Sequence, residues 1–128
     1  MLHCSVCDGL LEVREMVCPA CELHLSGDFS FPRLLRLSSK NLVLGEALIL
    51  AGGNLKELAQ TLGVSYPTVR KRVDDLIDEL QALRVADERK IDDILRGIEA
   101  GTVPAAKGTR MIKELNGSPS TPRPGTER

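Results

Sequence analysis

Aromatic residues are almost absent from this chain. Its 128 residues include no tryptophan, one tyrosine (Tyr66) and two phenylalanines (Phe29 and Phe31). Leucine, isoleucine, valine and alanine therefore carry the apolar content, which favours packing between helices. No large single core is available, because the first ~30 residues and a tail rich in glycine and proline take part of the length. We expect small modules.

No segment carries a large excess of one charge. The net charge is -1, and basic and acidic residues number three and five in residues 1–39, six and six in residues 40–86, and six and six in residues 87–115. No block is therefore basic enough to bind nucleic acid by charge alone.

Two further absences narrow the function. The chain has no run of about eighteen apolar residues, and no apolar signal-peptide core follows Met1-Leu2-His3, so we expect a cytoplasmic protein without a membrane partner. It also has only two histidines, no glycine-rich phosphate loop and no nucleophile paired with a base. These absences predict that the protein is not an enzyme.

The cysteines form two matched pairs, Cys4-Ser-Val-Cys7 and Cys18-Pro-Ala-Cys21, with ten residues between them. Two intervening residues let both sulfurs of a pair face one tetrahedral ion at roughly 2.3 Å, and ten residues suffice for two short strands and a turn. The pattern predicts a zinc ribbon in residues 1–32, with Zn²⁺ as a structural cofactor. Four thiolates leave no position for water or substrate.

Other uses of these cysteines fit less well. Structural disulfides are rare in a reducing cytoplasm. A thioredoxin-type pair opens a helix, whereas Leu11-Glu12-Val13-Arg14 after the first pair alternates like a strand. Iron in a rubredoxin-like site is an open alternative, although the small number of aromatic residues in this segment argues against it. His3 and His24 flank the pairs and could each replace a thiolate, but the complete cysteine set favours outer neighbours of the ligands or simply exposed side chains.

The middle of the chain predicts three helices. Ser38 is an N-cap candidate for a first helix that ends at Gly52-Gly53 and packs through Leu42, Ala47, Leu48 and Leu50. Asn54 caps a short helix to Leu62, and Gly63 ends it in the left-handed conformation. Ser65 caps a third helix that runs to about Leu83 and carries Pro67 in its first turn. The inward positions are Leu58, Ala59, Leu62, Val64, Val69 and Val73.

This segment resembles the helix-turn-helix of Fis-type bacterial DNA-binding proteins. The resemblance covers about twenty-five residues and rests on Gly53-Asn54, Leu58-Ala59, Leu62-Gly63-Val64-Ser65 and Thr68-Val69-Arg70-Lys71-Arg72-Val73.

The whole chain is also similar to an uncharacterised bacterial family of unknown function. In that family a zinc ribbon precedes S-Y-P-T, here Ser65-Tyr66-Pro67-Thr68, and a SHOCT-like helical pair follows. The resemblance implies a transcriptional regulator. This chain departs from the family's I-S-x-E-E-A pattern at Val103-Pro104-Ala105-Ala106-Lys107-Gly108, where a glycine is expected to weaken the helix.

We expect the third helix to read the major groove of double-stranded DNA with its first two turns. The candidate contacts are Ser65, Tyr66, Pro67, Thr68, Arg70 and Lys71. The alternative is a solvated face, in which Arg70 pairs with Asp74 and Lys71 with Asp75. Acidic residues further along the helix repel phosphate, so that part should point away from DNA.

A heptad seam continues along the third helix through Leu76, Leu80 and Leu83. It fits either a homodimer, with Glu79 opposite Arg84 of the second chain, or packing on the first helix. Residues 87–115 predict a helical hairpin, with Gly101 ending one helix and Pro104 opening the next.

The predicted fold is mainly α with a small N-terminal β zinc ribbon. A trihelical helix-turn-helix core occupies residues 33–86, the hairpin residues 87–115 and a disordered tail residues 116–128. The expected function is a DNA-binding transcriptional regulator. The alternative is an adapter that docks the ribbon and hairpin on transcription or translation machinery, for which the acidic thiolate-rich ribbon is better suited than for binding phosphate.

Overall fold

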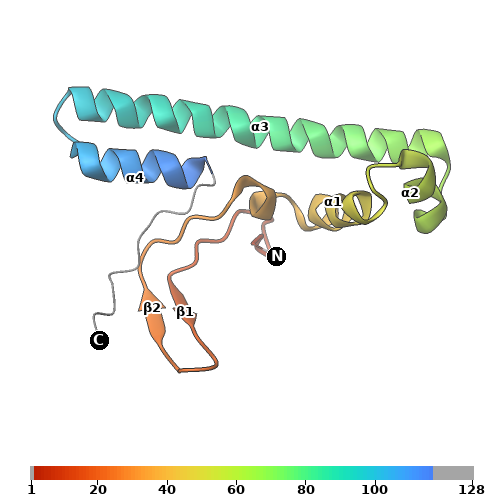
Figure 1. The fold of residues 1–128 in the computed structure, drawn as a ribbon, viewed down its shortest axis with the longest axis horizontal. Coiled ribbons are helices and arrows are strands. Elements are labelled where there is room, and N and C mark those ends of the chain that lie inside the picture. The colour runs from red at the N-terminus through yellow and green to blue at the C-terminus, as the bar shows by residue number, and fades with distance from the viewer. Residues whose placement is uncertain (1, 117–128) are drawn as a thin grey trace.

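A single long helix organises the structure (Figure 1). The computed structural model describes residues 2–116. In chain order the elements are β1 (Glu15–Val17), β2 (His24–Ser26), the 3-10 helix η1 (Arg33–Arg36), α1 (Ser39–Leu50), α2 (Leu55–Leu62), α3 (Tyr66–Glu99) and α4 (Ala105–Leu115). The expectation of a mainly helical chain with a small N-terminal sheet is confirmed.

The two strands flank the second cysteine pair. β1 and β2 are antiparallel, with Met16 opposite Leu25, and their hairpin projects away from the helices in Figure 1. An isolated antiparallel bridge between His3 and Leu10 encloses the first pair in the same way. The strand expected at residues 11–14 is therefore misplaced, because the chain pairs immediately around each cysteine turn.

Local signals set the ends of α2 correctly. The Asn54 carboxamide oxygen accepts hydrogen bonds from the backbone N–H groups of Lys56 and Glu57, at 3.0 and 3.2 Å. Gly63 ends the helix with φ 66°, a left-handed conformation in which a side chain is strained. Sequence alone predicts both ends of this helix.

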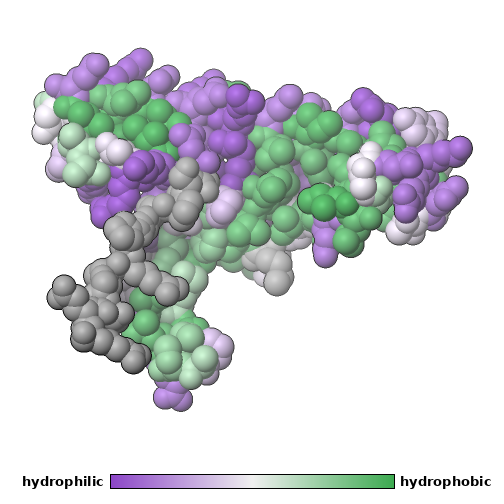
Figure 2. Space-filling view, viewed as in Figure 1, coloured by the Kyte–Doolittle hydropathy of each residue, from purple (hydrophilic) through white to green (hydrophobic). Residues whose placement is uncertain are grey.

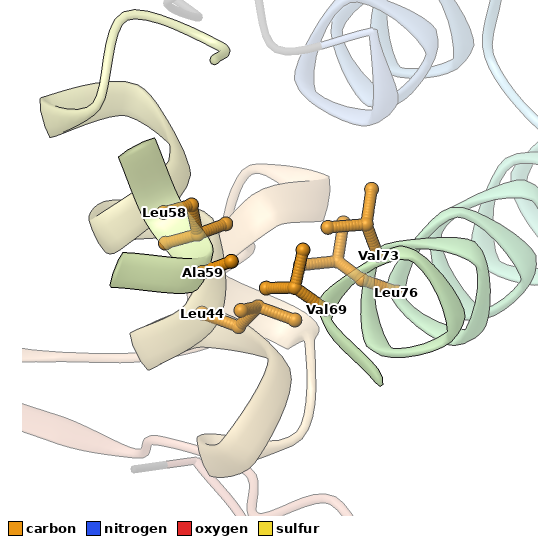
Figure 3. Packing of buried hydrophobic residues seen from close by; sticks show 6 residues of the cluster. All are labelled: Leu44, Leu58, Ala59, Val69, Val73 and Leu76. Atoms are coloured by element: carbon orange, nitrogen blue, oxygen red, sulfur yellow. The ribbon is translucent and has the colours of Figure 1, made fainter. Parts of the chain in front are cut away.

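The core lies where α1, α2 and α3 meet (Figure 3). Six side chains from the three helices turn toward one another there: Leu44, Leu58, Ala59, Val69, Val73 and Leu76. Two sequence expectations are wrong, since Leu62 is exposed and Leu50 is 80% exposed. Leu44 and Leu48, four residues apart on one face of α1, point toward the core, whereas Leu50 lies off that face.

α3 continues through the boundary expected near residue 83. Residues 84–86 are Arg, Val and Ala, none of which breaks a helix, so the third helix and the first helix of the hairpin are one element of 34 residues. At 1.5 Å per residue α3 is about 50 Å long. α1 and α2 pack near its N-terminal end and α4 near its C-terminal end.

A buried ion cluster joins η1 to the middle of α3. The Asp87 side chain is fully buried and accepts hydrogen bonds from Arg33 Nε at 3.0 Å and from Arg36 Nη1 and Nη2 at 2.9 and 2.5 Å. Burial raises the pKa of this carboxyl, but donation from Arg36 and Arg33 outweighs it, so the pKa lies below its usual value. Asp87 is therefore a charged residue on the inward face of α3.

Close packing between α3 and α4 depends on Gly108. This glycine is buried, and a Cβ atom there would overlap Ile98 Cδ1, 2.9 Å from Ile98 Cγ1 and 3.2 Å from Ile94 Cγ2. The carbonyl of Gly97 fixes the turn between α3 and α4. It accepts hydrogen bonds from the two backbone N–H groups that follow Gly101, at 2.9 and 3.1 Å. Gly108, expected to weaken the helical pair, is the residue that lets the two helices approach.

Two remaining expectations concern membranes and the tail. Along residues 2–116, no helix combines the length and apolar content needed to cross a bilayer. Asn116 caps the end of α4, and the rest of the tail expected to be disordered lies outside the described residues.

Gly108→Val tests the packing of the hairpin. The added side chain meets Ile98 and Ile94, and overpacking of this kind costs about 1–3 kcal/mol, so α4 should detach from α3. Amide hydrogen exchange is expected to show lost protection over residues 105–115, with α1 and α2 unchanged. Ala106→Val, at an exposed site of the same helix, is the matched control. Equal protection in the two variants would show that the contact does not hold the hairpin.

Candidate nucleic-acid interface

The turn between α2 and α3 sets the direction of the third helix. The backbone N–H of Gly63 donates to Gln60 O at 3.2 Å, and that of Val64 donates to Ala59 O at 3.1 Å. These bonds satisfy two of the last four carbonyls of α2, and the left-handed Gly63 turns the chain so that α3 starts after two further residues. The helix, tight turn and helix form as the sequence predicts.

Ser65 closes the start of α3. Its Oγ accepts a hydrogen bond from Thr68 N at 3.4 Å and lies 2.8 Å from Thr68 Oγ1, while its carbonyl accepts from Val69 N at 3.1 Å. Pro67 has no N–H. The first turn therefore offers few free backbone donors to a phosphate, and its side chains are the stronger candidates for contact.

The candidate side chains are all exposed on this end of the molecule. Ser65, Pro67 and Thr68 face solvent beside Tyr66, which is 52% exposed. Arg70 and Lys71 follow one turn later on the outer side of α3, away from the buried Val69 and Val73. The structure thus brings together the residues that the sequence assigned to DNA contact.

Arg70 already has a partner. Its Nε lies 3.4 Å from Asp74 Oδ1, with both side chains half or more exposed. An exposed pair of this kind contributes about 1 kcal/mol at most, so a phosphate can replace the carboxylate. Lys71 makes no ion pair with any residue in the range 2–116, so the pairing with Asp75 proposed for a purely solvated face is not found there.

Two further basic residues are exposed on α2 and on the first two turns of α3. Lys56 is exposed in the first turn of α2, the helix that crosses the DNA backbone in helix-turn-helix proteins, and Arg72 is exposed on α3 beside Lys71. The position of Lys56 two residues after the Asn54 cap could have identified it from the sequence. Beyond Arg72, the exposed side chains of Asp74 and Asp75 limit the basic surface to the first two turns.

The heptad seam is used largely within the chain. Leu76 is part of the buried core with Leu44 and Leu58, and Leu80 and Leu83 are half-buried further along the same stripe. Packing on the first helix, one of the two uses left open by the sequence, is therefore what the structure shows for Leu76.

Glu79 caps the N-terminus of α1. Its carboxylate accepts hydrogen bonds from the backbone N–H of Ser38 at 2.5 Å, from Ser38 Oγ at 2.9 Å and from the amide nitrogen of Asn41. The Ser38 side chain makes no capping bond of its own. A carboxylate from α3 thus takes the capping role at the positive end of α1 that was expected of the Ser38 side chain.

The two cysteine pairs adopt the same turn. In each, the N–H of the first cysteine donates to a carbonyl five residues later, and its carbonyl accepts from the N–H four residues later: Cys4 with Gly9 and Asp8, Cys18 with Leu23 and Glu22. Asp8 and Glu22, which directly follow the second cysteines, have φ 57° and 58°. We call these turns knuckles. Each holds two thiols side by side.

The knuckles also polarise their first thiol. Backbone N–H groups of Cys7 and Val6 and the Cys7 thiol lower the pKa of Cys4, and the corresponding groups of Cys21 and Ala20 lower the pKa of Cys18. These donors favour thiolate, the form that binds a metal ion. Within residues 2–116, however, no three histidine, cysteine or acidic side chains are close enough to share an ion, so the two knuckles stand apart.

The histidines play different roles. His3 lies with Nδ1 3.1 Å from Asp8 O and Nε2 3.3 Å from Arg36 O, which raises its pKa and ties the first knuckle to η1. His24 pairs with Glu15 across the exposed hairpin at 2.7 Å. Neither ring faces a thiol pair closely enough to complete a metal site.

Comparison with known proteins points to the helical core. Residues 37–83 match a family model described as "Domain of unknown function (DUF2089)-HTH". The match runs from the end of η1 through α1 and α2 to the middle of α3, and thus supports a helix-turn-helix of a family whose function is unknown. It includes neither the cysteine pairs nor α4. No curated protein and no solved structure matches the chain.

The cap formed by Glu79 predicts how stability depends on pH. Burial raises the pKa of Glu79, but donation from Ser38 N–H, the Asn41 side chain and Ser38 Oγ outweighs it and the pKa is lowered. A lowered pKa stabilises the folded state above the ordinary glutamate pKa of about 4.3, and this stabilisation is lost as pH falls through the folded value.

Glu79→Gln should therefore lower the free energy of unfolding at neutral pH by about 1–3 kcal/mol, because charge-assisted hydrogen bonds are lost. The difference from wild type should shrink as the pH is lowered below about 4. Urea unfolding at several pH values measures both effects. Asp78→Asn, an exposed acid on the same helix, is the control and should change little at any pH. A pH-independent difference would rule out the charged cap.

Proposed function

We propose that the chain is a DNA-binding regulator of transcription and that the N-terminal end of α3 enters the major groove. The observation that carries the proposal is the exposed basic surface at the start of α3, held by the left-handed turn at Gly63 and packed on α1 and α2 through Val69 and Val73. This is the arrangement in which a recognition helix presents its first turns to base edges. The helix-turn-helix designation of the matching family model supports it.

The roles of the side chains follow from their positions. Arg70 and Lys71 are suited to phosphate or guanine contacts, and Lys56 to the flanking backbone. Tyr66 and Thr68 lie one turn earlier, where side chains of a recognition helix reach the bases. Contact should end near Asp74, since the acids beyond it repel phosphate.

A charge-matched pair of variants tests this surface. Arg70→Ala with Lys71→Ala should weaken binding to a mixed-sequence duplex at low salt and lower the salt slope by about two units, since each lost phosphate contact removes about 0.9 of a unit. Arg84→Ala with Arg89→Ala removes the same charge from exposed positions further along α3 and should leave the slope unchanged.

Tyr66 reports the contact directly, because it is the sole tyrosine in a chain without tryptophan. DNA should change its emission in wild type and in the Arg84/Arg89 variant, but not in the Arg70/Lys71 variant. Equal affinity and equal salt slope in both double variants would refute the recognition surface.

We also propose that Cys4, Cys7, Cys18 and Cys21 bind one structural Zn²⁺, as the donor set and the two matching knuckles support. Zinc would draw together turns whose local geometry is already set, and thereby fix the hairpin of β1 and β2 relative to the first knuckle. With four thiolate ligands the ion has no open position, so it would stabilise this segment and take no part in a reaction.

Zinc content tests this site. Purified protein should contain one zinc per chain, and chelation should raise hydrogen exchange in residues 2–32 while the helices keep their protection. Cys7→Ser or Cys21→Ser should abolish stoichiometric zinc, whereas His24→Gln, a control at the exposed histidine, should retain it. Iron in the purified protein, or intact free thiols without metal, would contradict the proposal.

One observation favours the adapter as the second candidate. The N-terminal segment exposes apolar side chains, namely Val6, Leu10, Leu11, Met16, Val17, Leu23 and Leu25. Closure of the knuckles around zinc would cover part of this surface, and a protein partner would cover the same atoms. Co-purification with a protein complex, together with no binding to duplex DNA, would select the adapter.

A further inference from the structure

A second apolar surface lies on the helical body, apart from the candidate DNA contacts. The groove between η1 and α1 has a volume of about 390 Å³ and is lined by Leu34, Leu35, Leu37, Leu42, Gly45, Glu46, Ile49 and Leu50. Gly45 contributes no side chain to its wall. In Figure 2 hydrophobic surface spreads over the region that α1 and η1 occupy in Figure 1.

The rim of this groove on α1 is a ridge of exposed aliphatic side chains. Ile49 and Leu50, which line the groove, are 72% and 80% exposed, and Val43 next to it is 66% exposed, although α1 packs in the core through its other face. Together with Leu34 and Leu35, they expose an area on the order of 600 Å² per copy, comparable to the roughly 800 Å² that each partner contributes to a standard interface.

We propose that this surface pairs with the same surface of a second copy, forming a dimer with two-fold symmetry. A two-fold interface requires a patch that complements itself, and a ridge next to a groove of similar chemistry meets that requirement. If two α1 helices cross antiparallel at Val43, the Leu50 end of each helix lies over η1 of the other copy. The ridge of one copy then enters the groove of the other.

The charges on α1 fit the same arrangement. Lys40 and Glu46 are exposed, and each is three residues from Val43 on opposite sides. Antiparallel crossing at Val43 therefore sets Lys40 of each copy opposite Glu46 of the other. Parallel pairing would place equal charges together, which is unfavourable.

The dimer would supply the affinity that one short basic surface on a nearly neutral chain lacks. The proposal itself does not depend on DNA binding, since the oligomeric state is measured without DNA. Failure of one proposal is therefore distinguishable from failure of the other. The heptad seam is not needed for this dimer, because Leu76 remains in the core of each copy.

Sedimentation equilibrium of the zinc-supplemented full chain tests the interface. Wild type should show twice the 13.9 kDa chain mass at micromolar concentrations. Leu50→Glu should raise the dissociation constant about 100-fold or more, because two charges enter an apolar contact in each dimer. Val85→Glu, at a half-exposed valine on α3, is the control and should leave the dimer intact. Circular dichroism should show equal helicity in all three proteins.

Charge reversal identifies the partner as a second copy. Lys40→Glu and Glu46→Lys should each weaken the dimer, and the double variant should restore it, because the opposed charges are exchanged together. A monomeric wild type would overturn the proposal. The groove would then be a candidate site for a helix of another protein. A dimer that survives Leu50→Glu, or that the double variant fails to restore, would overturn this interface as well.

Discussion

One face of α3 is the constraint on which the rest of the helical structure depends. α1, α2, η1 and α4 all pack against it, in different segments of a helix about 50 Å long. Near its start Val69 and Val73 meet α1 and α2, in the middle Asp87 holds η1, and near its end Ile94 faces α4. Each of these elements packs on its own segment of α3. A substitution at one inward-facing position of α3 should therefore affect only the element packed there, whereas a kink in α3 would move the elements on either side of it relative to each other.

Two acids give this stripe its specificity. A purely apolar stripe would accept η1 and α1 in several registers, but Asp87 requires Arg33 and Arg36, and Glu79 requires the N-terminus of α1. A buried carboxylate that loses such partners costs about 3–5 kcal/mol, so alternative registers are strongly disfavoured. The first knuckle joins the same region through His3, whose ring lies against the carbonyl of Arg36. The N-terminal segment is thus anchored to the helices at its first knuckle, while the tip of its hairpin projects away from them.

The sequence predicts those features that local chemistry decides. Asn54, Gly63 and Ser65 fix the ends of the helix-turn-helix through caps and a left-handed turn, and Pro104 opens α4 as expected. Features that depend on distant residues are not predictable from one sequence. No local pattern shows that Glu79 and Asp87 face inward, and Gly108 is expected to weaken its helix as long as its contact with Ile98 is unknown. For the candidate site, the sequence identifies the exposed residues but does not show that Ser65 accepts hydrogen bonds from the backbone N–H groups of Thr68 and Val69.

The central claim is that the start of α3 recognises DNA. Selection of bound duplexes from a random pool by the purified protein, supplied with zinc, tests it most directly. We predict enrichment of one short shared sequence, arranged as two half-sites if the chain is dimeric, and its loss when Arg70 and Lys71 are replaced by alanine. Recovery of no common sequence at any salt concentration, by a folded protein supplied with zinc, would contradict the claim.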